Sequence, residues 1–123
     1  MKVLVTGSRW WGPKHVDIIH RELVKFPEKT IIVHGACRGV DEIAGEIAKE
    51  LNFIVRDYPA NWKKFENSAG PIRNRQMVSE EHKQDEPIDL ILAFHDDIDK
   101  STGTSDMIAV GVKAGISYKL VTQ

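Results

Sequence analysis

Short apolar runs alternate along the chain with longer stretches in which apolar residues recur every three or four positions. The short runs, rich in β-branched and aliphatic residues without strict alternation, cover residues 2–6, 31–33, 53–55, 88–94 and 118–121. Runs of this kind are typical of strands that are covered on both faces. The pattern therefore predicts five short strands, of which residues 2–6 and 31–33 are expected to be covered on both faces.

The stretches between these strands carry the period of amphipathic helices. Residues 13–26 begin at a proline, which suits a first helical position, and repeat apolar side chains along one face. Residues 40–51 have the clearest apolar stripe, and residues 71–82 a thinner one. Residues 104–114 are followed by Gly115, a residue type that commonly ends helices. Four helices are therefore expected.

Two connections are predicted to be irregular. Residues 59–70 are rich in Pro, Asn, Ser, Ala and Gly, and residues 95–101 are polar. A long loop without secondary structure is uncommon in a compact domain, so residues 59–70 point to a functional segment.

Alternating strands and helices predict an α/β fold with helices on both faces of a mostly parallel five-stranded sheet, a three-layer α/β/α sandwich. The length of 123 residues fits a single domain over 1–123. Right-handed crossovers place all strand-to-helix loops at one edge. With the strand order 3-2-1-4-5, a ligand crevice forms between the first and fourth strands, flanked by the loops at Gly7 and Gly103.

Composition narrows the class of protein. Hydrophobic residues make up 41% and charged residues 28%, as in soluble globular domains. The net charge of −1 favours a small ligand over nucleic acid or an anionic membrane surface. One cysteine excludes an intramolecular disulfide, and no apolar stretch approaches a membrane span. Without a signal-peptide pattern at the N-terminus, a cytoplasmic location is expected.

Three predicted strands end in small residues suited to anions. Gly7-Ser8-Arg9 offers a tight turn, a hydroxyl and a guanidinium that can pair with phosphate through two hydrogen bonds. Gly103 opens a helix where backbone N–H groups bind phosphate, and Thr104 and Ser105 add hydroxyls. The alternatives are an ordinary helix cap and a surface arginine.

The segment from His34 to Asp41 is the densest in candidates. Gly35 and Gly39 permit backbone conformations that a Cβ forbids. Asp41 either caps the following helix or accepts ribose hydroxyls. Cys37 has no partner base in the sequence, so a catalytic thiol is not expected, and His34 is interpreted as structural.

Residues 70–75 place two guanidiniums and an amide near a helix start. Cations there oppose the helix dipole, which favours an anion bound by Arg73, Arg75 and Asn74 beside Gly70. The alternative is that the arginines pair with acidic residues of the chain: Asp57, Glu66 or Asp96.

Three tryptophans, Trp10, Trp11 and Trp62, are expected in loops, as base-stacking platforms, an apolar lid over the sheet edge or a dimer contact. The aspartates of residues 96–99 are interpreted as a solvated loop rather than metal ligands. No cofactor and no metal is expected, because no Cys/His cluster has zinc spacing.

The order of these motifs resembles the SLOG superfamily, and more closely its YspA/YpsA-related branch, over nearly the whole chain. The motifs that carry the resemblance are Gly7–Arg9, His34–Asp41, Gly70–Asn74 and Thr102–Asp106. Of these, Gly-Pro-Ile-Arg-Asn is the most specific. The resemblance implies a Rossmann-like fold with a pocket for nucleotides or nucleotide-derived ligands.

Two better-known relatives imply different activities. LOG phosphoribohydrolases, which release a base from a nucleoside 5′-monophosphate, share the Gly-Thr helix start and an arginine matched by Arg73 or Arg75. Their Pro-Gly-Gly turn is replaced here by residues 99–101, and their glutamate falls on Met107, beside Asp106. DprA-type proteins bind single-stranded DNA and resemble residues 35–41 and 73–75.

Three hypotheses follow. The first is a domain that binds a phosphoribosyl-type ligand, as a sensor would, and that forms a homodimer. The second is an N-glycosidic hydrolase, with Asp106, Asp41 and Arg73 as the catalytic candidates. The third is a single-stranded nucleic-acid or partner-binding module. The expected ligand-binding residues are Gly7, Ser8, Arg9, Gly35, Arg38, Gly39, Asp41, Trp62, Gly70, Arg73, Asn74, Gly103, Thr104 and Ser105.

Overall fold

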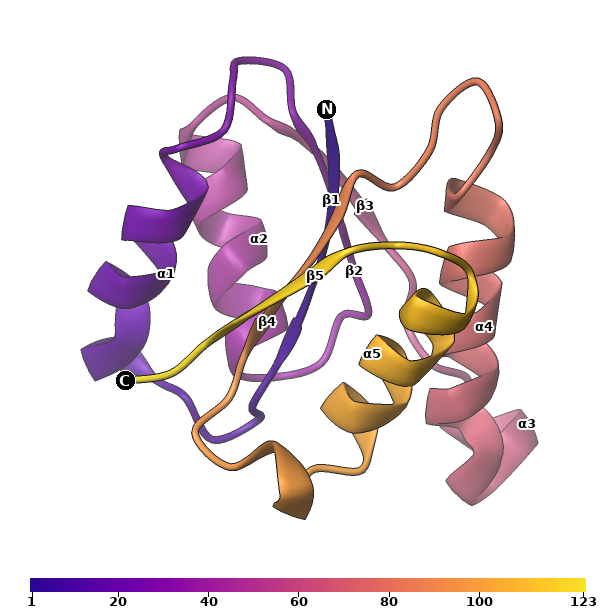
Figure 1. Cartoon of the computed structure of the whole chain (residues 1–123). Coiled ribbons are helices and arrows are strands. Elements are labelled where there is room, and N and C mark those ends of the chain that lie inside the picture. Colours follow the sequence, from indigo (N-terminus) through magenta and orange to yellow (C-terminus); the bar gives the residue numbers. More distant parts are fainter.

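The computed structural model describes all residues 1–123 and contains one five-stranded, wholly parallel sheet (Figure 1). The strands are β1 (Lys2–Gly7), β2 (Ile31–His34), β3 (Ile54–Asp57), β4 (Leu90–Phe94) and β5 (Tyr118–Val121). Their order is β3-β2-β1-β4-β5, the order for which the sequence places a crevice between the first and fourth strands. The Rossmann-like α/β fold is therefore confirmed.

Helices cover both faces of the sheet (Figure 1). Helices α1 (Val16–Leu23) and α2 (Val40–Glu50) lie on one face, and α4 (Ala69–Glu81) and α5 (Gly103–Lys113) on the other. Successive strand residues point to opposite faces. In β1, Val3 and Val5 accordingly pack into the α1/α2 core, while Leu4 packs into the α4/α5 core. The apolar runs of β1 and β4 lack alternation because both of their faces are covered, whereas the edge strands β3 and β5 are partly exposed.

The prediction of a loop over residues 59–70 is wrong. Helix α3 (Trp62–Phe65) and a 3₁₀ turn at Glu66–Ser68 occupy most of it, and α4 begins at Ala69. The Asn61 side chain accepts a hydrogen bond from the Lys64 N–H and caps α3. Trp62 and Phe65 are partly exposed, so this short helix has no buried apolar stripe by which the sequence could reveal it.

Other boundaries shift by smaller amounts. Pro71 is the third residue of α4 rather than its first, within the turn that tolerates a missing N–H. The first helix starts as a 3₁₀ turn at Pro13–His15 and ends at Leu23, which leaves Phe26 outside it. A further 3₁₀ turn, Ile98–Lys100, lies within the predicted polar loop after β4.

A cluster of charges around the buried side chains of Lys2 and Glu81 fixes the C-terminal end of α4 to the sheet. Lys2 Nζ lies 3.0 Å from Glu81 Oε1 and 2.8 Å from Glu86 Oε1, with the lysine side chain 1% exposed. Arg56 Nη1 lies 2.8 Å from both carboxylates, and the Tyr58 hydroxyl donates to Glu81. Arg73 and Asn74 lie near the other end of the same helix. The cluster therefore also helps to position these two side chains at the carboxyl edge of the sheet.

No helix of the chain combines the length and the apolar character needed to cross a lipid bilayer.

Candidate functional site

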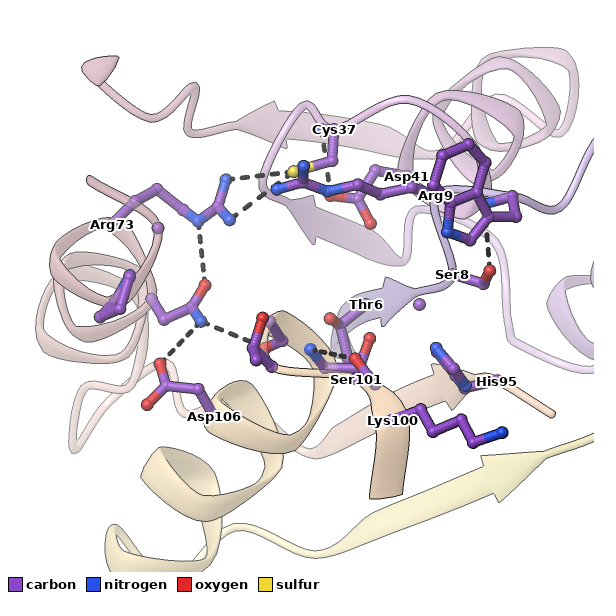
Figure 2. Close-up of a pocket in the computed structure, with 18 of the residues that line it drawn as sticks. Thr6, Ser8, Arg9, Cys37, Asp41, Arg73, His95, Lys100, Ser101 and Asp106 are labelled. Carbon is purple, nitrogen blue, oxygen red and sulfur yellow. Dashed lines mark hydrogen bonds between the residues drawn. The ribbon is translucent and has the colours of Figure 1, made fainter. Parts of the chain in front are cut away.

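A cavity of about 560 Å³ opens at the carboxyl edge of the sheet, next to β1 and β4. Its volume lies within the ~300–1,000 Å³ range of small-molecule sites. Figure 2 shows Cys37, Asp41 and Arg9 on one side, Arg73 and Asp106 on another, and Ser101 and Lys100 below. Only three of its twenty lining residues are hydrophobic, so the cavity suits a polar ligand.

The structure brings most of the predicted site residues to this cavity. All three catalytic candidates, Asp41, Arg73 and Asp106, line it. The other predicted ligand-binding residues that line it are Gly7, Ser8, Arg9, Trp62, Gly70, Asn74, Gly103 and Thr104. The strand ends, far apart in sequence, converge because the sheet is parallel.

Helix α5 presents its N-terminal turn to the cavity. The Thr104 N–H donates to Ser101 Oγ at 3.0 Å, whereas the N–H groups of Gly103 and Ser105 donate to no acceptor within the chain. A Cβ built on Gly103 would meet no atom within 4 Å, so this residue borders open space. Free amides at the positive end of a helix favour an anion at this wall.

Two exposed arginines near the cavity stack on tryptophans rather than pairing with carboxylates. The Arg9 guanidinium lies 5.7 Å from the centre of the Trp62 ring, and that of Arg38 lies 4.5 Å from the Trp10 ring. Neither arginine takes part in a salt bridge of the chain. Their charges therefore remain available to an anionic ligand.

Arg73 has an internal role that the sequence does not reveal. It is 7% exposed, and its guanidinium donates to the carbonyl oxygens of Gly35 and Tyr58 and to Asn74 Oδ1. A Cβ on Gly35 would collide with this guanidinium. Arg73 thus braces the loop after β2 while one side of it borders the cavity.

Arg75 forms an ion pair within the chain, but its partner is Asp106 rather than one of the three acidic residues considered from the sequence. Arg75 Nη1 lies 3.3 Å from Asp106 Oδ2, and neither arginine pairs with Asp57, Glu66 or Asp96. Asn74 Nδ2 also donates to Asp106 Oδ2, at 2.9 Å. Asp106 therefore joins α4 to α5 and is already engaged by donors from α4.

Asp41 does not cap helix α2, because no side chain caps that helix. Its Oδ2 accepts from the N–H groups of Gly35, at 3.1 Å, and Cys37, at 3.3 Å. The second carboxylate oxygen accepts no hydrogen bond from the chain, although the residue is 6% exposed. Figure 2 shows the carboxylate beside Arg9 at the cavity. Burial raises the pKa of Asp41 to about 6.

Four predicted ligand residues lie outside this cavity. Gly35 and Arg38 line a smaller neighbouring hollow instead. Gly39, with φ of 83°, lies against the Ser8 carbonyl, where a Cβ would collide with the first loop. The Ser105 hydroxyl donates to the carbonyls of Ile98 and Ser101, which leaves only its amide free.

Several lining residues were not predicted as ligand contacts. His95, Lys100, Ser101 and Thr102 come from the loop after β4, and Asn67 from the turn before α4. The first four follow a strand of a parallel sheet, so position alone indicates that they lie near the crevice. Asn67 carries no such signal.

Two further residues belong to the structural part of the fold. Trp11 is 4% exposed, stacks on His15 and tilts against Phe94, so it covers the core and has no free face for a base. His34 accepts the Ala36 N–H through Nδ1, and burial lowers its pKa. This agrees with the interpretation of His34 as structural.

Two glycine substitutions at the sheet edge should have opposite effects on the stability of the fold. Gly103→Ala is expected to leave the melting temperature unchanged or raise it, since the new methyl meets open space at a helical position. Gly35→Ala is expected to cost about 1–3 kcal/mol, because its methyl overlaps the buried Arg73 guanidinium. Thermal unfolding followed by circular dichroism compares the two, and equal losses would contradict this geometry.

A Rossmann-like domain with a polar crevice at the carboxyl ends of β1 and β4 is the class that the structure defines. Residues 1–65 match the model of the YspA, cpYpsA-related SLOG family. The chain is also similar to the Gene 61 protein of Mycobacterium phage D29, at 33% identity over 122 residues, covering 94% of this chain and 91% of the phage protein. The chain belongs to the YspA, cpYpsA-related SLOG family. No solved structure matches it significantly.

Proposed function

We propose that the chain binds a nucleotide or a nucleotide-derived phosphoribosyl ligand in the crevice between β1 and β4. The observation that carries this proposal is the N-terminal turn of α5, where the Gly103 N–H has no acceptor in the chain, at a polar cavity that Arg9, which forms no salt bridge, also lines. Backbone N–H groups and a guanidinium together provide directional donors and positive charge for a phosphate.

The sugar would lie between this anion site and Asp41. The unengaged oxygen of the Asp41 carboxylate is the acceptor that a ribose hydroxyl needs, and the Gly35 and Cys37 amides hold the other oxygen in place. A ligand whose hydroxyl donates to a buried acceptor binds more tightly than an analogue without that hydroxyl, because the analogue leaves the acceptor unpaired. The proposed ligand is therefore a ribonucleotide rather than a deoxyribonucleotide.

The cavity geometry supports binding better than N-glycosidic cleavage by Asp106. Both Arg75 and Asn74 already contact the Asp106 carboxylate, so its charge is partly compensated before any ligand enters. A carboxylate that stabilises an oxocarbenium-like transition state works best when its charge is directed at the ligand.

As part of this proposal, the protein acts in the cytoplasm, as a sensor and a homodimer.

Isothermal titration calorimetry with AMP and GMP, and with the nucleosides adenosine and guanosine, tests the proposal. We expect the monophosphates to bind and the nucleosides to bind at least about tenfold more weakly, since they lack the charged group. Arg9→Ala should weaken the monophosphates, by about 1.5–3 kcal/mol for a charged hydrogen bond. Arg21→Ala, which removes an exposed arginine of α1, is the matched control and should bind as the wild type does.

The sugar assignment is tested separately by comparing AMP with 2′-deoxy-AMP and 3′-deoxy-AMP. Wild-type protein should bind AMP more tightly than at least one of the deoxy analogues. Asp41→Ala should remove that preference while keeping the selectivity for phosphate over nucleoside. A preference that persists unchanged in Asp41→Ala would assign the ribose contact to another residue.

A further inference from the structure

A second hollow of about 390 Å³ adjoins the cavity at the sheet edge. The two hollows share three lining residues, Arg9, Cys37 and Trp62, so they meet along the line where the Arg9 guanidinium lies over the Trp62 ring. They are therefore neighbouring compartments on one surface rather than separate sites.

The two compartments differ in chemical character. Four of the eight residues around the second hollow are hydrophobic, against three of twenty around the first. Pro59 and Ala60 provide apolar walls there, and no acidic residue lines it. The first compartment suits charged and hydroxylated groups, whereas the second suits a flat and partly apolar group with polar edges.

Trp62 is placed to offer a ring face at the junction. It is the first residue of α3, is 47% exposed, and rests against Gly70, where an added Cβ would lie 3.5 Å from Trp62 Cη2. The indole therefore lies in contact with the first turn of α4. An indole held in this way and partly open to solvent is a stacking surface for an aromatic ring.

We infer that the second hollow is the base subsite, in which the nucleobase stacks on Trp62 while the phosphate lies at the N-terminus of α5. This inference rests on the proposed function and adds the orientation of the ligand. The shared position of Arg9 places its guanidinium between the two ends, where it can contact both phosphate and base. Arg38, which lines only the second hollow, supplies donors for the edge of the base.

Calorimetric titration of Trp62→Leu and Trp62→Phe with AMP and with ribose 5-phosphate tests this subsite. Trp62→Leu should weaken AMP at least about fivefold and leave ribose 5-phosphate unchanged, because only AMP has a ring to stack. Trp62→Phe keeps a ring face and should retain most of the AMP affinity. Tyr118→Leu, which removes an exposed aromatic ring of β5, is the matched control, since Tyr118 lines neither hollow. Melting temperatures confirm that each variant folds.

Tryptophan fluorescence provides a second readout. AMP should quench the emission of wild-type protein and of Trp10→Phe, and should quench Trp62→Phe less, since Trp11 is buried and Trp10 lines only the first hollow. Equal weakening of AMP and ribose 5-phosphate by Trp62→Leu, or undiminished quenching in Trp62→Phe, would overturn the inference and leave the proposed function standing. Failure of wild-type protein to bind either ligand would remove both.

Discussion

Replacing Glu81 with leucine is expected to lower the free energy of unfolding by about 3–5 kcal/mol. Glu81 is 4% exposed and compensates Lys2, which is 1% exposed. Without this carboxylate, the Lys2 ammonium keeps only Glu86, a half-exposed residue, and backbone carbonyls as partners. An ammonium that loses its buried counter-charge bears a desolvation cost that the remaining contacts do not offset.

The double variant Lys2→Met/Glu81→Leu is the control for this loss. Replacing both buried charges with apolar side chains of similar size is often neutral, so the double variant should recover most of the stability lost by Glu81→Leu. Urea unfolding followed by circular dichroism measures all three proteins. A double variant as unstable as Glu81→Leu would show that the carboxylate acts through Arg56 and Tyr58 rather than through Lys2.

Asp41→Asn is expected to remove a pH-dependent loss of about 3 kcal/mol from the free energy of unfolding. Burial raises the pKa of Asp41 from its ordinary value of 3.8 to about 6 in the folded protein. Between these two values the folded state keeps a proton that the unfolded state has lost. The free energy of unfolding therefore falls as pH rises through this window, by about 1.36 kcal/mol per pH unit.

The asparagine variant lacks this titration, so it should gain stability relative to the wild type as pH rises from about 4 to 7. Unfolding free energies of both proteins, measured across this range, isolate the contribution of Asp41 because the other carboxylates titrate equally in both. A difference between the two proteins that stays constant with pH would contradict the assignment of a buried, partly unpaired carboxylate.

The three layers were predictable because they depend on patterns that repeat along the chain. The apolar runs of β1 and β4 result from burial on both faces of the sheet. The apolar stripe of α2 results from burial on one side of the helix. The region 59–70 was not predictable in the same way. Its short helix is held by the Asn61 cap and packs against the following 3₁₀ turn and α4, and such contacts leave no periodic signal in the sequence.

The candidate site was predictable in position and less so in the role of each residue. Glycines at strand ends and at helix starts indicated the crevice, because a parallel sheet brings those ends together. Arg73 and Asp106 have internal partners that come from distant segments, and the sequence cannot reveal them. Gly39 is required by the approach of Ser8, a packing constraint that resembles a ligand-binding turn in sequence.

Amide chemical-shift mapping by NMR during titration with AMP tests directly whether a nucleotide binds in the crevice between β1 and β4. With 123 residues, the protein is small enough for each backbone N–H to be followed. We expect saturable shifts at Ser8 and Arg9, at Gly103 to Ser105, and at the Trp62 side-chain N–H. Absence of shifts at millimolar AMP, or shifts confined to the outer surfaces of α1 and β5, would contradict a nucleotide site in this crevice.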